Sequence, residues 1–97
     1  MTLNSVIDKK LVESWHRGNE KAFEELFHRY FTKLYAYALK FISDRSVAEE
    51  TVMDVMFTVW QKKQAVNADL SLSAYLFKSV RNRVIDHFRN QYKFDHG

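Results

Sequence analysis

Apolar side chains repeat at helical spacing along a long stretch of the chain, residues 20–42. Side chains three and four positions apart share one face of an α-helix, so the pattern predicts one long amphipathic helix. The chain has no proline that would interrupt it. We interpret the stripe as protein core rather than as a cofactor site. Its members are Phe23, Leu26, Phe27, Tyr30, Leu34, Tyr37, Ala38 and Phe41.

Three further helices are predicted from similar stripes, over residues 6–17, 46–61 and 71–92. Turn-forming residues predict a loop from Lys63 to Leu70. A chain of 97 residues with 46% apolar content is large enough for one core. We therefore predict an all-α fold, a compact bundle of four helices over residues 1–92. Residues 93–97 are expected to begin a linker or to be the cut end of a longer chain.

Local signals mark several helix ends and the core. Gly18 is expected to end the first helix, and Asn19 to cap the second. Ser46 with Glu49 has the form of a capping box, which predicts the start of the third helix. Phe88 is expected to close the core stripe of the fourth helix. The side chains expected to be largely buried are Trp15, Phe27, Leu34, Val55, Val59, Val80 and Val84.

Charge is divided unevenly along the sequence. Residues 1–60 hold eight Lys/Arg and nine Asp/Glu, whereas residues 61–97 hold seven Lys/Arg and three Asp/Glu. The asymmetry favours two different partners, with the basic half a candidate for nucleic acid. The chain has no cysteine, which excludes disulfides and thiolate metal sites. No stretch has the length of a signal peptide or a membrane span, so no membrane insertion is expected.

The predicted third helix has an unusual outer face. The face opposite its core stripe carries both acidic and large apolar side chains. Apolar anchors in an acidic frame suit a basic protein partner. The alternative is that another helix of the same domain covers Met53 and Phe57. The residues of this face are Glu50, Met53, Asp54, Phe57 and Gln61.

The basic second half combines residue types that bind nucleic acid. Cations bind phosphates, amides hydrogen-bond base edges, and aromatic rings stack on unpaired bases. The alternative interpretation is an ordinary solvated helix face. The candidate DNA-binding residues in the loop and the fourth helix are Lys62, Lys63, Asn67, Asp69, Ser71, Tyr75, Lys78, Asn82 and Arg89.

Two Glu-x-x-His pairs have the spacing used in di-metal helical bundles, Glu13 with His16 and Glu25 with His28. On a helical wheel both pairs point away from the core stripes, and further inward acids are missing. We therefore predict no metal site, no catalytic residues and no cofactor. His87 lies beside an apolar face and is expected to be a packed histidine.

Three blocks of sequence, in order, resemble region two of bacterial extracytoplasmic-function sigma factors, the promoter-melting domain. The resemblance covers about residues 5–92. The first block surrounds GNEKAFEEL at residues 18–26. The second, AEETVMDVMFTVW at residues 48–60, is similar to the family's polymerase-binding helix. The third, AYLFKSVRNRVIDHFR at residues 74–89, is similar to its melting helix.

The resemblance implies a non-enzymatic transcription initiation factor in the bacterial cytoplasm. The third helix would bind the coiled coil of the RNA polymerase β′ subunit. The loop and fourth helix would hold the non-template single strand of the minus-ten promoter element, with one base flipped into a pocket. Asn82 stands where the family keeps an asparagine near that base, and Tyr75 at an aromatic position. An anti-sigma factor is a further implied partner.

The sequence departs from the family pattern in two places. Met53 stands where the family usually has glutamine, so it offers packing in place of one hydrogen bond. Met56 stands where phenylalanine is usual. The helix-turn-helix domain of such factors lies outside these residues, so we expect an excised domain or a truncated product. The competing hypothesis is a helical protein-interaction module that does not bind DNA.

Overall fold

The structure, a computed structural model, describes residues 2–96, and side chains from Thr2 to Tyr92. It confirms the all-α prediction, because the described residues form helices and no strand. No described helix has the length and apolar character needed to cross a bilayer. The elements are α1 (Leu3–His16), α2 (Glu20–Leu39), α3 (Arg45–Gln61), the short 3₁₀ helix η1 (Lys63–Ala65) and α4 (Leu72–His96).

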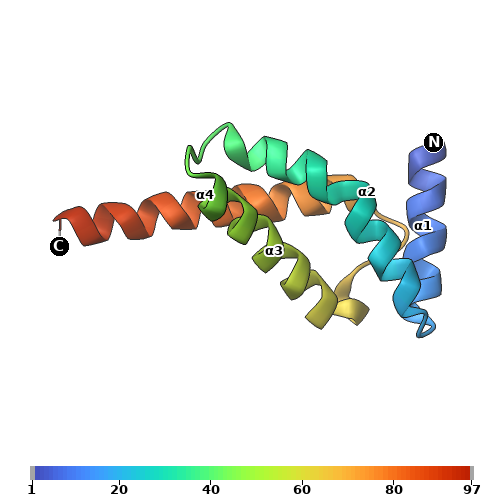
Figure 1. Cartoon of the computed structure of the whole chain (residues 1–97). Helices are drawn as coiled ribbons and strands as arrows, with labels where there is room; N and C mark the ends of the chain where they lie inside the picture. Colours follow the sequence, from blue (N-terminus) through green and yellow to red (C-terminus); the bar gives the residue numbers. More distant parts are fainter. Residues whose placement is uncertain (1, 97) are drawn as a thin grey trace.

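The helices form an elongated bundle of 46 by 22 by 21 Å (Figure 1). α2 packs against α1, α3 and α4, and α3 also packs against α4. α1 crosses one end of the bundle, and the last turns of α4 continue past the other helices at the opposite end (Figure 1). This leaves α3 with an inner side toward α2 and α4 and an outer side without a neighbouring helix.

The core consists of aliphatic and aromatic side chains from all four α-helices. Burying one such aliphatic side chain contributes about 1.5–3 kcal/mol of transfer free energy. Six of the seven side chains expected to be buried are buried, which confirms the inward faces of the helices. They are Trp15, Leu34, Val55, Val59, Val80 and Val84.

Three aromatic residues are less buried than expected. Phe27 is half-buried, because it stacks on Phe31 at the edge of α2 with ring centroids 5.2 Å apart. Phe41 is 48% exposed, since α2 ends at Leu39 and Phe41 belongs to the following turn. Phe88 is 45% exposed and lies in the second half of α4, which runs beyond the bundle (Figure 1).

Helix ends follow local hydrogen bonding. Asp44 is the N-cap of α3 and accepts from the backbone N–H of Ser46 at 2.8 Å. The predicted capping box is therefore wrong, because the carboxylate two residues earlier satisfies the first free amides. Gly18 follows the end of α1 with φ +102°, a left-handed conformation that favours glycine, and Asn19 caps α2; both predictions are confirmed.

Other bounds differ from the predicted ones by a few residues. α1 begins at Leu3 rather than Val6, because Thr2 accepts a hydrogen bond from the Ser5 N–H and so caps the helix earlier. α2 ends three residues early, and η1 occupies part of the predicted loop. α4 continues past residue 92 to His96, and the boundary of the domain at that point stays a prediction.

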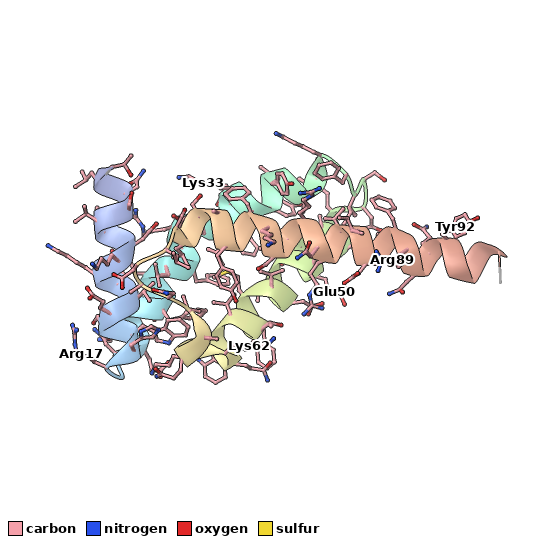
Figure 2. The ribbon with its side chains drawn as sticks, turned by 180° about the vertical axis from the view of Figure 1, so that it is seen from behind. Arg17, Lys33, Glu50, Lys62, Arg89 and Tyr92 are labelled. Atoms are coloured by element: carbon pink, nitrogen blue, oxygen red, sulfur yellow. The ribbon has the colours of Figure 1, made fainter. Side chains whose placement is uncertain are left out.

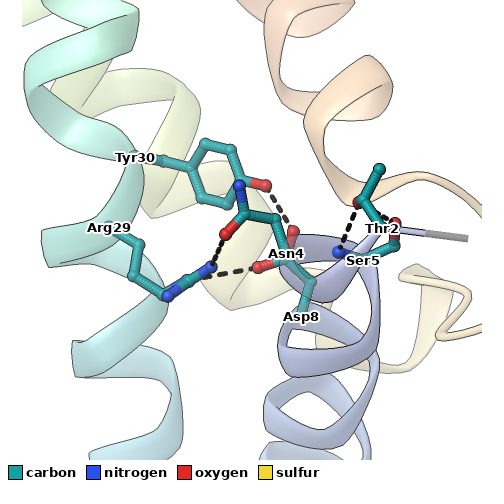
Figure 3. Close-up of polar contacts among 6 residues, drawn as sticks. All are labelled: Thr2, Asn4, Ser5, Asp8, Arg29 and Tyr30. Atoms are coloured by element: carbon teal, nitrogen blue, oxygen red, sulfur yellow. Dashed lines mark hydrogen bonds and ion pairs between the residues drawn. The ribbon is translucent and has the colours of Figure 1, made fainter.

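A buried polar cluster joins α1 to α2 (Figure 3). Asp8 is only 5% exposed, and its carboxylate accepts from Tyr30 Oη and from Arg29 Nε, the latter at 3.3 Å. Arg29 also donates to Asn4 Oδ1 at 3.2 Å. A buried carboxylate is tolerated only with such partners, so the cluster fixes the crossing of α1 on α2. The sequence had indicated Tyr30 as core but gave no sign of Asp8.

The same cluster changes the titration of Tyr30. Burial, together with the hydrogen bond to the Asp8 carboxylate, raises the pKa of Tyr30 to about 12. Between pH 10 and 12 the unfolded chain loses this proton while the folded chain keeps it. The unfolded state then binds fewer protons, so stability decreases as pH rises through this range. The shift corresponds to about 2–3 kcal/mol of unfolding free energy.

We predict that Tyr30→Phe removes this alkaline loss. The variant is less stable than the wild type near pH 9. Between pH 10 and 12 the unfolding free energy of both proteins decreases, and the decrease is about 2 kcal/mol smaller for the variant than for the wild type. Urea unfolding at a series of pH values measures the difference. Parallel curves for the wild type and Tyr30→Phe would contradict the assignment.

Candidate nucleic-acid and protein interfaces

The outer face of α3 carries large apolar side chains in contact with solvent. Met53 is 44% exposed and Phe57 is 57% exposed. Glu50 and Asp54 beside them are exposed as well. No described helix covers Met53 or Phe57, which excludes the alternative that this face is packed within the domain. Gln61, the last residue of α3, is also exposed, so all five predicted residues of this face lie at the surface.

Trp60 belongs to the same surface and was not predicted. It is 45% exposed, and its ring stacks on Phe57 with centroids 6.1 Å apart. Its Nε1 donates to Glu20 Oε2 at 3.2 Å, which holds the indole against the start of α2. The available signal was its position three residues after Phe57, which places both on neighbouring parts of a helix. We name Glu50, Met53, Asp54, Phe57 and Trp60 the α3 ridge.

The acidic side of the α3 ridge borders a groove toward α4. The groove has a volume of about 390 Å³, and Glu50 lies along it on α3 (Figure 2). Arg83 of α4 donates to Thr58 Oγ1 of α3 at 3.0 Å, which ties the two helices together near this groove. The lining residues are Val47, Glu50, Thr51, Asp54, Arg83, Asp86, His87 and Asn90.

A mainly apolar pocket of about 350 Å³ lies between the loop after η1 and the first turns of α4. We name it the loop pocket. Four of the predicted DNA-binding residues meet there: Asn67, Ser71, Tyr75 and Lys78. The aliphatic residues that complete its lining are Ala65, Val66, Leu70, Leu72 and Ala74.

Hydrogen bonds within the chain set the shape of the loop pocket. Asn67 Oδ1 accepts from the backbone N–H of Asp69 at 2.8 Å, which closes a tight turn. Ser71 Oγ accepts from the Ala74 N–H at 3.1 Å, as an N-cap does at a helix start. These contacts explain why turn and cap residues follow one another here. These hydrogen bonds hold the wall of the pocket in place when no partner is bound.

A second, smaller pocket of about 260 Å³ lies along α4 next to the end of α3. Lys62, Tyr75 and Asn82 contribute to its lining, and Lys62 is seen at the end of α3 in Figure 2. Tyr75 lines both pockets, so they adjoin at its ring. Asn82 is exposed, and within the described residues its side chain makes no hydrogen bond to the loop.

Lys63 faces a different part of the molecule. Its Nζ lies 4.0 Å from Glu20 Oε1 and 6.0 Å above the ring of Trp15. Its backbone carbonyl is 2.9 Å from His16 Nε2. Lys63 therefore ties η1 to α1 and α2 and does not line either pocket.

Two other predicted residues also lie apart from the pockets. Asp69 forms an ion pair with Lys9 of α1 at 3.0 Å, and the pair raises the pKa of Lys9. Arg89 lies 14 residues after Tyr75 on α4, about 21 Å along the helix axis. Its guanidinium is 3.8 Å from the Asp86 carboxylate (Figure 2). A single strand would have to follow most of α4 to reach both Tyr75 and Arg89.

Each of the three histidines whose side chain is described contacts a neighbouring group of the same chain. His16, as described, contacts a backbone carbonyl, and His28 lies 4.0 Å from Glu24 rather than pairing with Glu25. His87 is half-buried, with its ring 5.3 Å from that of Phe88. Within the part of the chain that the structure describes, no three His, Cys, Asp or Glu side chains are grouped to hold a metal ion.

Comparison with known proteins agrees with this arrangement. The family described as Sigma-70 region 2 matches residues 26–94. The chain is 41% identical over 75 residues to the ECF RNA polymerase sigma factor RpoE of Cereibacter sphaeroides. The aligned segment covers 76% of this chain and 41% of that relative. The chain thus spans less than half of the relative's length. No solved structure matches it. The chain therefore belongs to the sigma-70 region 2 family.

Proposed function

We propose that this domain acts in transcription initiation as a non-enzymatic adaptor between core RNA polymerase and a promoter. The α3 ridge binds the coiled coil of the β′ subunit. The loop pocket and α4 hold the non-template strand of the minus-ten element while the duplex opens. The domain works in the cytoplasm, and an anti-sigma factor that covered either surface would block it.

The exposure of Met53 and Phe57 is the observation that carries the polymerase assignment. Clustered large apolar side chains at a surface indicate an interaction site. Here Phe57 stacks on Trp60, whose indole is held by its hydrogen bond to Glu20. Glu50 and Asp54 on the same face complement a basic partner and oppose an acidic one. The ridge therefore has both an apolar anchor and a charge pattern suited to a basic coiled coil.

The loop pocket supports the assignment to single-stranded DNA. Its apolar walls can take a base that has left the stack, and Tyr75 offers a ring on which a neighbouring base can stack. Lys62 and Lys78 are exposed cations on either side of Tyr75 in the lining of the two pockets. They suit the phosphates of the same strand.

Asn82 is the proposed base-reading residue of the second pocket. A structural role would require hydrogen bonds from its amide to the loop, and within the described residues its side chain makes none. The amide is exposed on the same pocket wall as Tyr75. This arrangement supports contact with a base edge over a role as scaffold.

We predict that Asp54→Arg weakens binding of the domain to core polymerase at least several-fold, with a nearly unchanged melting temperature. A positive charge placed against a basic partner costs affinity, and the exposed position leaves the core intact. Glu25→Arg on α2 makes the same charge change on another exposed surface and should bind normally. The measurement is a pull-down with purified core polymerase and β′ fragment. Normal affinity of Asp54→Arg would argue against the ridge, and unfolding would make Asp54 a structural residue.

We predict that Lys78→Ala weakens binding of minus-ten single strands of any sequence. A plot of log K against log salt concentration has a negative slope, and losing one phosphate contact should make this slope shallower by about 0.7. Arg89→Ala should do the same if the strand follows α4 to that point. Lys33→Ala on α2 is the control, since Lys33 lines neither pocket. Titrations of the polymerase-bound domain at several salt concentrations test this. Binding without salt dependence would favour the protein-interaction module instead.

We predict that Asn82→Ala costs roughly 1–3 kcal/mol on the preferred strand, by analogy with base-edge contacts in duplex DNA. On a strand with that base changed, the substitution should cost little. Asn90→Ala, an exposed amide farther along α4, is the matched control. Competition between matched and mismatched strands on the polymerase-bound domain gives both values. Equal losses on the two strands would make Asn82 a phosphate or scaffold residue.

A further inference from the structure

We infer that the loop pocket selects thymine over cytosine, because its side chains present hydrogen-bond donors next to an aliphatic wall. The inference rests on the proposed binding of a single strand and goes further, since it names the base. Three features of the loop pocket carry it: the fixed orientation of one amide, the donors around it, and the apolar lining.

The orientation of the Asn67 amide is fixed by its own loop. The backbone N–H of Asp69 can only donate, and it lies 2.8 Å from the side-chain amide of Asn67. The carbonyl oxygen Oδ1 must therefore face Asp69, which leaves the Nδ2 group as the free side of the amide. Within the described residues Nδ2 makes no hydrogen bond. Asn67 thus offers the pocket a donor.

Two neighbouring groups add donors. Ser71 Oγ accepts from the Ala74 N–H, and its hydroxyl proton stays available to donate to a ligand. Lys78 carries an ammonium with three donors and no acceptor, and within the described residues it has no ion pair. The hydroxyls of Ser71 and Tyr75 can donate or accept, whereas Asn67 Nδ2 and the Lys78 ammonium can only donate. The base that fits this pocket best is therefore one whose edge carries a hydrogen-bond acceptor.

The aliphatic lining separates thymine from the other bases with acceptors. Thymine presents its O4 acceptor beside a C5 methyl group, and apolar side chains such as alanine contact that methyl. On the same edge, cytosine has an amino donor in place of O4, and this donor would meet the Nδ2 donor of Asn67. Adenine also presents an amino donor, and guanine offers O6 without a methyl. The wall of Ala65, Val66 and Leu70 gives the methyl group an apolar contact.

The test uses the full chain bound to core polymerase and fluorescent single strands that differ in one base. Each position of the minus-ten strand is varied in turn among thymine, uracil, cytosine and 5-methylcytosine. At one position, thymine should bind about fivefold tighter than cytosine, because the exchange removes an accepted hydrogen bond. 5-Methylcytosine should stay weak despite its methyl group. Uracil should lose at most about fourfold, the effect of one buried methyl.

The variant Asn67→Asp tests the assignment to this pocket. Its carboxylate still accepts from the Asp69 N–H, so the turn is kept, but the donor becomes an acceptor. At the selected position alone, the thymine-to-cytosine affinity ratio should fall below one, since a carboxylate accepts from the cytosine amino group. Gln64→Glu makes the same charge change at an exposed neighbour outside the pocket and should weaken all strands alike.

The outcomes separate the two proposals. If strands bind but thymine and cytosine are equal at every position, or if Asn67→Asp leaves the ratio unchanged, the inference is wrong and strand binding stands. If the polymerase-bound chain retains no strand better than polymerase alone, the proposed DNA binding fails and the inference fails with it.

Discussion

The packing of one side of α3 against both α2 and α4 is the constraint on which both proposed surfaces depend. Its inner stripe of Ala48, Val52, Val55 and Val59 is almost fully buried. These side chains are small or stiff at χ1, so two helices can approach closely and with one side-chain arrangement. Since both neighbours lie on the inner side, the outer side of the helix has no cover. The exposure of the α3 ridge is therefore a consequence of how the core is built, and a partner can use it without disturbing that core.

The loop pocket depends on the same core at its two ends. Val66 and Leu72 are both buried, one just after η1 and the other at the start of α4. Between them, residues 67 and 69–71 are exposed, and Ala68 is half-buried against the core. Turn and cap hydrogen bonds shape the exposed part of the loop. Anchoring a short loop at both ends lowers the entropy that it would lose on binding a ligand. The ion pair between Asp69 and Lys9 adds little on an exposed surface, but it holds the loop toward α1.

Sequence periodicity predicted the helices, the fold class and the outer face of α3, because these depend on spacing within one element. It could not predict what lies opposite a given side chain. Phe88 fits the core stripe of α4 as well as Val84 does, yet only Val84 has a neighbouring helix over it. Asp8 looks like a solvated helix charge until Arg29 and Tyr30 of α2 are placed above it. For the same reason the direction of Lys63, set by the 3₁₀ turn, could not be read from composition.

The length of α4 has a consequence for how such a domain could change its preference for DNA. The helix carries Leu76, Val80 and Val84 into the core and Tyr75 and Asn82 to the pockets. A shift in its register or rotation would therefore move the core side chains and the pocket side chains together, so these positions are mechanically coupled. The exposed loop residues 67 and 69–71 are not coupled in this way, because they lie outside the core. Divergence of specificity between related domains would then proceed through the loop, while the helix remains a fixed reference for the strand.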